Sequence, residues 1–121
     1  MTIGIFVLVK DQTTGEFIDV ETDSSKMLFG FYSHRGALWG SDLVRSLGLV
    51  LLPKLLDIGD LHLTTHDEFD LFEKEIRIIE KNIDIIAVDA GDQPKYIMHY
   101  VKNALEAISK ARELNGTIMI G

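Results

Sequence analysis

The 121-residue sequence contains no cysteine. This absence excludes disulfide bonds, thiolate zinc sites and cysteine nucleophiles. The sequence also lacks the usual phosphate-loop, dinucleotide-binding, serine-hydrolase and zinc-protease motifs. Its ten glycines are scattered along the chain and do not gather into a phosphate-binding loop. These absences favour a function other than catalysis, and we expect no cofactor.

Long apolar runs are missing as well. A membrane-spanning helix needs about 20 apolar residues. The most apolar window, residues 47–56, is interrupted by Gly48, Pro53 and Lys54. The N-terminal run 3–9 has no basic residue before it and no small-residue cleavage site after it, so it does not resemble a signal peptide. We therefore expect a cytoplasmic protein without a membrane partner.

Positive charge is scarce. Nineteen acidic residues outnumber 12 basic ones, which gives a formal net charge of −7. Lysine and arginine form no cluster, so we do not expect nucleic-acid binding. An acidic surface attracts basic partners, although acidity also serves solubility alone.

The chain as a whole has the composition of one globular domain, residues 1–121. Hydrophobic residues make up 46% and charged residues 26%, and a domain of this length can bury a sizeable core. Residues 3–9 are rich in β-branched side chains and predict a buried strand. The alternation in residues 17–22 predicts the return strand of a hairpin. Residues 27–32 suit either a third strand or a buried irregular segment.

The strongest helical signal is the segment 65–88. Thr65 and Glu68 form a capping-box pattern at its start. One apolar row then recurs at helical spacing and predicts a core face. Its members are Phe69, Phe72, Ile76, Ile79, Ile83 and Ile86. A second apolar row, formed by Leu71, Ile78 and Ile85, lies about 110–150° round the helix.

Two other helical regions complete the pattern. Residues 41–58 predict a shorter helical region that starts with Ser41 as an N-cap. Residues 94–115 predict a second long helix, and short strands are expected near 61–64 and 117–120. The predicted fold is therefore α+β, with a small, mostly antiparallel sheet backed by two long helices.

The second apolar row also bears on assembly. One small domain need not cover Leu71, Ile78 and Ile85 completely, and contiguous exposed apolar surface usually marks a contact. We therefore expect a homodimer with these residues at the interface. The alternative is that the last helix covers the row within the monomer.

The loop 33–40 is the first candidate binding site. It holds the only tryptophan, Trp39, together with His34 and Arg35. Tryptophan and arginine are enriched in binding hot spots, and loops carry many binding residues. A forked hydrogen-bond pair from Arg35 would suit an anionic group. The alternative is that Trp39 packs in the core while His34 and Arg35 face solvent.

Three other groups could carry chemistry. His62 and His66, followed by acidic residues, are weak metal candidates, because they fall on a strand and a helix and do not share one helical face. Asp89 and Asp92 lack the further oxygen ligands of a calcium loop, so we interpret this segment as a turn between helices. A third group on the last helix contains Tyr96, His99, Tyr100 and Asn103, and His99 is expected to face solvent.

Three functions compete on this evidence. The first is an acidic interaction or regulatory protein that binds another macromolecule, such as an inhibitor or immunity-type partner of a basic protein. The second is a small enzyme or small-molecule-binding domain with its pocket near the 33–40 loop. The third is a self-associating structural subunit.

Overall fold

The computed structural model describes residues 1–20 and 23–121, and its strands form one antiparallel sheet. The strands are β1 (Thr2–Lys10), β2 (Phe17–Asp19), β3 (Leu28–Phe31), β4 (Leu61–Leu63) and β5 (Thr117–Ile120). Their order is β2-β1-β5-β4, and β3 pairs with the beginning of β1. The predicted hairpin and the two short strands are confirmed, and the segment 27–32 contains a third strand. The last two residues of the predicted return strand lie outside the described residues.

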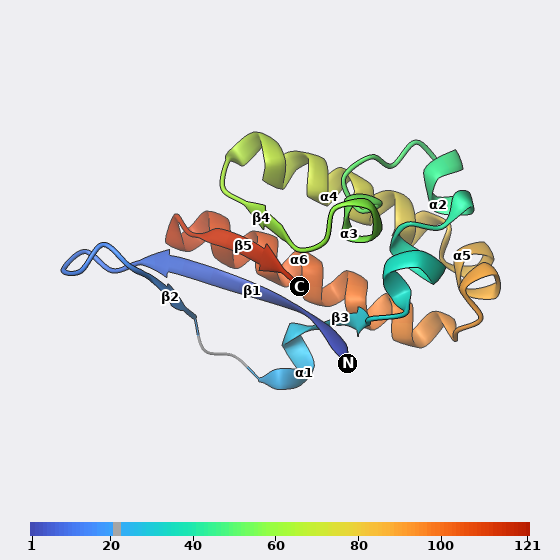
Figure 1. The fold of residues 1–121 in the computed structure, drawn as a ribbon, viewed down its shortest axis with the longest axis horizontal. Coiled ribbons are helices and arrows are strands. Elements are labelled where there is room, and N and C mark those ends of the chain that lie inside the picture. Colours follow the sequence, from blue (N-terminus) through green and yellow to red (C-terminus); the bar gives the residue numbers. More distant parts are fainter. Residues whose placement is uncertain (21–22) are drawn as a thin grey trace.

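The helices include two long ones on one side of this sheet (Figure 1). The described helices are α1 (Ser24–Met27), α2 (Asp42–Ser46), α3 (Lys54–Asp57), α4 (His66–Lys81), α5 (Ile83–Ala90) and α6 (Pro94–Leu114), with one π-helical turn, η1 (Arg35–Trp39). The long helix α6 lies against β1 and β5, and α4 packs beside α6. The predicted α+β fold with two long helices behind a small sheet is confirmed. No helix of the described residues combines the length and apolar character needed to cross a bilayer.

Alternation along the strands decides which side chains enter the core. Ile5 and Val7 of β1 pair with Ile120 and Ile118 of β5, and all four are buried toward the helices. On α6 an inner row at helical spacing is also buried. Its members are Ile97, Val101, Ala104, Ile108 and Ala111. Side chains alternate faces along a strand and recur every 3.6 residues along a helix. The apolar face of the strands and the apolar face of α6 therefore pack against each other.

The segment 65–88 begins as predicted. The Thr65 hydroxyl accepts a hydrogen bond from the backbone N–H of Glu68 at 3.2 Å, and the Glu68 carboxylate accepts from the backbone N–H of Thr65 at 3.1 Å. The backbone N–H of Thr64 adds a third bond, at 3.0 Å. This last bond is the main cause that lowers the pKa of Glu68. The capping box thus fixes where α4 starts.

The same segment does not continue as a single helix to residue 88. Asn82 separates α4 from α5, with φ −115° and ψ 25°. Its side-chain amide donates a hydrogen bond to the carbonyl oxygen of Ile78 at 2.8 Å. Asparagine side chains compete with backbone donors in this way, which explains the break. The longest helix is consequently α6 and not the segment that begins at Thr65.

The helical region 41–58 consists of α2 and α3 joined by an irregular loop. The Ser41 hydroxyl accepts from the N–H of Val44 at 3.1 Å, so the predicted N-cap is confirmed. The loop is held by Glu75, a buried carboxylate on α4 that is 2% exposed. It accepts hydrogen bonds from three consecutive N–H groups at 2.9–3.1 Å. The donors are Val50, Leu51 and Leu52.

Candidate functional site

The loop 33–40 directs its tryptophan into the core. Trp39 is 0% exposed and stacks on Phe29, with ring centroids 4.2 Å apart. Its indole N–H donates to the carbonyl oxygen of Phe29 at 3.1 Å. Trp39 therefore occupies the core position that the alternative interpretation of the sequence gave it.

Arg35 joins the same loop to the segment around α3. Its guanidinium donates to the carbonyl oxygen of Leu55 at 2.8 Å and to the carboxylate of Asp60 at 2.7 Å. It also lies over the ring of Tyr32, 5.5 Å from the centroid. In this geometry the donors expected to bind an external anion are directed at groups of the chain itself.

His34 is buried as well, and its hydrogen bonds define its protonation. Its Nδ1 accepts from the backbone N–H of Phe31 at 2.9 Å, so Nδ1 carries no proton. Nε2 therefore carries the proton and donates to the carboxylate of Asp92 at 3.1 Å. A neutral imidazole thus connects β3 to the α5–α6 turn. Gly30, with φ +114°, makes room for it, because a Cβ there would lie 2.8 Å from Nδ1.

A cleft lies beside this histidine. It has a volume of about 360 Å³ and is lined by Leu28, Phe31, Asp92, Tyr96, His99 and Tyr100. Phe31 and Tyr96 are each 46% exposed, whereas Tyr100 is 2% exposed. We call it the aromatic cleft, and its lining contains both exposed rings and one buried ring. Its volume falls in the range of small-ligand pockets, about 300–1,000 Å³.

One cleft residue, His99, differs from what its position on the helical wheel predicts, and Asn103 of α6 shares its partner. His99 was expected to face solvent, but its Nε2 donates to the carbonyl oxygen of Ser25 at 2.7 Å. Asn103 donates to the same oxygen at 2.9 Å, so α6 fixes both side chains against the end of α1. Burial is the main cause that raises the pKa of Tyr100, and the negative charge of Asp92 is the second cause. The sequence grouped Tyr96, His99 and Tyr100, but it gave no signal that Phe31 and Asp92 join them.

A second feature is the outer face of α5. Asp84, Ile85, Val88 and Asp89 lie within about 140° of the helix circumference at about 100° per residue. All four are exposed, Ile85 to 54% and Val88 to 83%. We call these four residues the α5 surface. It places two apolar side chains between two carboxylates.

The row predicted as a dimer interface is divided between two helices. Leu71 on α4 is 36% exposed, and Ile78 is partly buried against the core. Ile85 belongs to the α5 surface. The three side chains do not form one continuous exposed row.

The sheet offers a third feature, on the side away from α4 and α6 (Figure 1). The register places Phe6 beside Met119 and Leu8 beside Thr117, on the opposite face from the buried isoleucines. Phe17 of β2 is 51% exposed and meets His62 edge to face, with centroids 6.0 Å apart. We define Phe6, Leu8, Phe17 and Met119 as the open sheet face.

The histidines considered as metal ligands have other contacts. His62 lies on β4 and its Nε2 is 2.9 Å from the hydroxyl of Thr117. His66 begins α4 and meets Phe69 edge to face. Within the part of the chain that the structure describes, no three histidine or carboxylate side chains are grouped to hold a metal ion.

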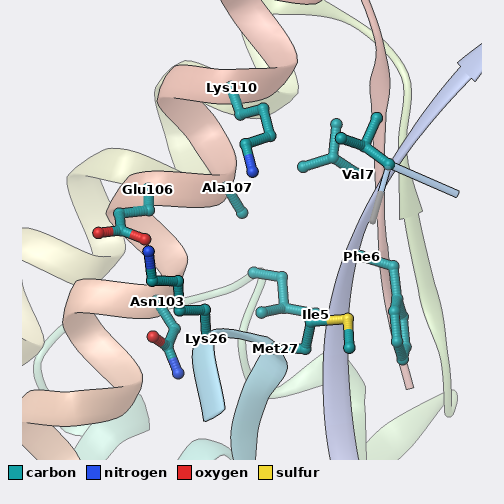
Figure 2. A pocket seen from close by; sticks show the side chains of 10 residues that line it. Ile5, Phe6, Val7, Lys26, Met27, Asn103, Glu106, Ala107 and Lys110 are labelled. Atoms are coloured by element: carbon teal, nitrogen blue, oxygen red, sulfur yellow. The ribbon is translucent and has the colours of Figure 1, made fainter. Parts of the chain in front are cut away.

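Another cavity lies between α6 and β1 (Figure 2). Ala107 and Lys110 of α6 line it on one side, and Ile5 and Val7 of β1 on the other. Its volume of about 20 Å³ is room for roughly one water molecule. It is therefore a packing gap and not a ligand site.

Comparisons of this chain with protein-family models, curated proteins and solved structures found no match. Three features of the molecule itself bear on its function. These are the aromatic cleft, the α5 surface and the open sheet face.

Proposed function

We propose that this protein binds a basic partner protein through the α5 surface and acts as an acidic interaction or regulatory protein. The observation that carries the proposal is the exposure of Ile85 and Val88 between Asp84 and Asp89. Apolar anchors provide desolvation energy at an interface, and flanking charges speed association and fix register. An inhibitor of a basic protein is one concrete form of this function.

The distribution of charge supports a basic partner. The stretch 82–94 contains Asp84, Asp89 and Asp92 but no lysine or arginine. Elsewhere, all four arginines lie in ion pairs with carboxylates of the same chain. The excess negative charge around α5 is therefore available to an external cation.

Asp89 adds a second argument. It lies near the C-terminal end of α5, which has no basic residue in its last turn. The helix dipole is negative there, so a carboxylate at this position is unfavourable by about 0.3–1 kcal/mol. Stability does not explain Asp89, whereas a basic partner would remove the repulsion. A second copy of this chain would instead bring like charges together.

The test begins with capture of partners from the native host and their identification by mass spectrometry. We expect a basic protein at stoichiometric yield, with an affinity that falls as salt rises. In the purified pair, the double substitution Asp84→Asn with Asp89→Asn should weaken binding about tenfold at low salt.

The matched control is Glu106→Gln with Glu113→Gln, which removes the same two charges from exposed positions on α6. Its effect on affinity should be smaller. Equal losses in both variants, or a partner without excess basic residues, would refute the proposal.

A second function, self-association, is favoured by the open sheet face. We propose that two copies meet through Phe6, Leu8, Phe17 and Met119. In the strand register of the described residues, Lys10 pairs with Phe17 and Asp19 pairs with Leu8, so each sign of charge is present once. A second copy therefore meets no net repulsion there, whereas a basic partner gains no electrostatic attraction.

Light scattering at micromolar concentration should then give twice the monomer mass of 13.6 kDa. Phe17→Ser should shift the protein toward the monomer, because it replaces an exposed aromatic ring on this face. The control is Ile58→Ser, since Ile58 is 72% exposed outside the face. A mass of 13.6 kDa for the unmodified protein would reject the dimer.

A further inference from the structure

We propose that the aromatic cleft binds an alkylammonium cation. The cleft combines the rings of Phe31, Tyr96 and Tyr100 with the carboxylate of Asp92. Aromatic rings attract cations through their negative faces, and several rings around one site recognise quaternary and methylated ammonium groups. The inference goes beyond the proposed function, because the cation can belong either to a partner's lysine or to a free amine.

The charge of Asp92 is the first argument. Its side chain is 21% exposed and accepts from His34 Nε2 at 3.1 Å and from the backbone N–H of Gln93 at 2.8 Å. Neither donor carries a positive charge, since His34 is neutral while its Nδ1 accepts from Phe31. Within the described residues, Asp92 therefore has no cation that neutralises it.

The hydroxyl of Tyr100 is the second argument, independent of the first. Tyr100 is 2% exposed, yet no hydrogen bond among the described residues involves its hydroxyl. This oxygen is not one of the fully enclosed unpaired atoms. Tyr100 lines the cleft. Buried polar groups normally have partners, so an unpaired hydroxyl on a cleft-lining residue indicates a ligand or a water that bonds to it.

The charged groups around the cleft agree with a cation. Burial and the field of Asp92 raise the pKa of Tyr100, so its hydroxyl is neutral at physiological pH. Lys95 already lies over the ring of Tyr96, with its ammonium 5.1 Å from the centroid. Lys95 is not among the residues that line the cleft. The remaining polar wall is His99, whose Nε2 donates to the carbonyl oxygen of Ser25.

The experiment compares choline with its neutral isostere 3,3-dimethylbutanol, using calorimetry and amide NMR shifts of the whole protein. The two probes have nearly the same shape and apolar area and differ in charge. We expect choline to bind and to shift the amides of residues 31 and 92–100, whereas the alcohol should bind at least tenfold more weakly. Equal binding of the two probes, or no binding of choline, would overturn the proposal.

Substitutions then test whether the cation binds at the aromatic cleft. Tyr96→Leu should weaken choline binding by about 2- to 30-fold, the range of one cation–π contact. The matched control is Tyr32→Leu, which removes a tyrosine ring of comparable exposure, 60% against 46%, from outside the cleft. Both side chains are half exposed, so both variants should keep the melting temperature. Equal affinities in the two variants would contradict the assignment of the cleft.

Two further probes distinguish the source of the cation. Nα-acetyl-lysine amide and its Nε-trimethyl counterpart each carry one positive charge, as choline does, on a protein-like side chain. Tighter binding of either than of choline indicates a partner's lysine, and tighter binding of choline indicates a free amine. This inference and the proposed function also fail on different results. If choline binds but no basic partner is captured from the host, this inference stands and the proposed function is refuted.

Discussion

Replacing Glu75 with leucine is expected to destabilise the protein by about 3 kcal/mol or more. The substitution leaves the N–H groups of Val50, Leu51 and Leu52 without the carboxylate that accepts all three bonds. Each buried donor that loses its partner costs about 1–3 kcal/mol, and the loop cannot turn these groups outward while Leu51 and Leu52 remain buried. Urea unfolding monitored by tryptophan fluorescence measures the loss.

Glu73→Leu is the matched control. Glu73 lies two residues earlier on α4, and its carboxylate, 41% exposed, pairs with Arg112 at 3.2 Å. Exposed ion pairs contribute about 0–1 kcal/mol, so this variant should stay close to the unmodified protein. If the Glu75 and Glu73 variants lost equal stability, Glu75 would not hold the loop.

Ile79→Ala should cost about 2–5 kcal/mol, the range for truncation of a large buried aliphatic side chain. Ile79 is 0% exposed and lies in the core beside Phe72 and Ile76, which are also fully buried. The cost arises from lost apolar burial and from the cavity that the rigid neighbours leave open. A thermal or urea unfolding series measures it.

Ile85→Ala provides the comparison for this prediction. It removes the same atoms from a side chain that is 54% exposed on α5. Because little burial is lost there, we expect a change below about 1 kcal/mol. If Ile79→Ala unfolded like the unmodified protein, the tight core packing of Ile79 would be contradicted.

Several features could be predicted because they depend on neighbours within one or two turns of chain. The capping box at Thr65 and Glu68 needs only residues three positions apart, and it forms as expected. The apolar rows of α4 and α6 needed only the helical period. The break at Asn82 is also local, but apolar periodicity cannot reveal it, because Ile86 remains buried after the break.

The candidate site depends on contacts between elements that are distant in the sequence, so only part of it could be predicted. Tyr96, His99 and Tyr100 share a helix, so the sequence could group them. Phe31 and Asp92 join them only because β3 and the α5–α6 turn pack against α6. The sequence predicted Trp39 and Arg35 in a binding loop, with a core position for Trp39 as the alternative, whereas in the structure both side chains bond to partners in the chain itself.

The sequence by itself determined the type of most elements, the faces that enter the core and the acidic balance of the surface. Only the tertiary structure decided that β5 lies between β1 and β4, that Glu75 is buried and that an open cleft lies beside His34. The physical reason is the range of the interactions. Capping and periodicity are satisfied within a few residues, whereas Glu75 bonds to donors 23–25 residues away, and such pairings exist only once the layers have packed.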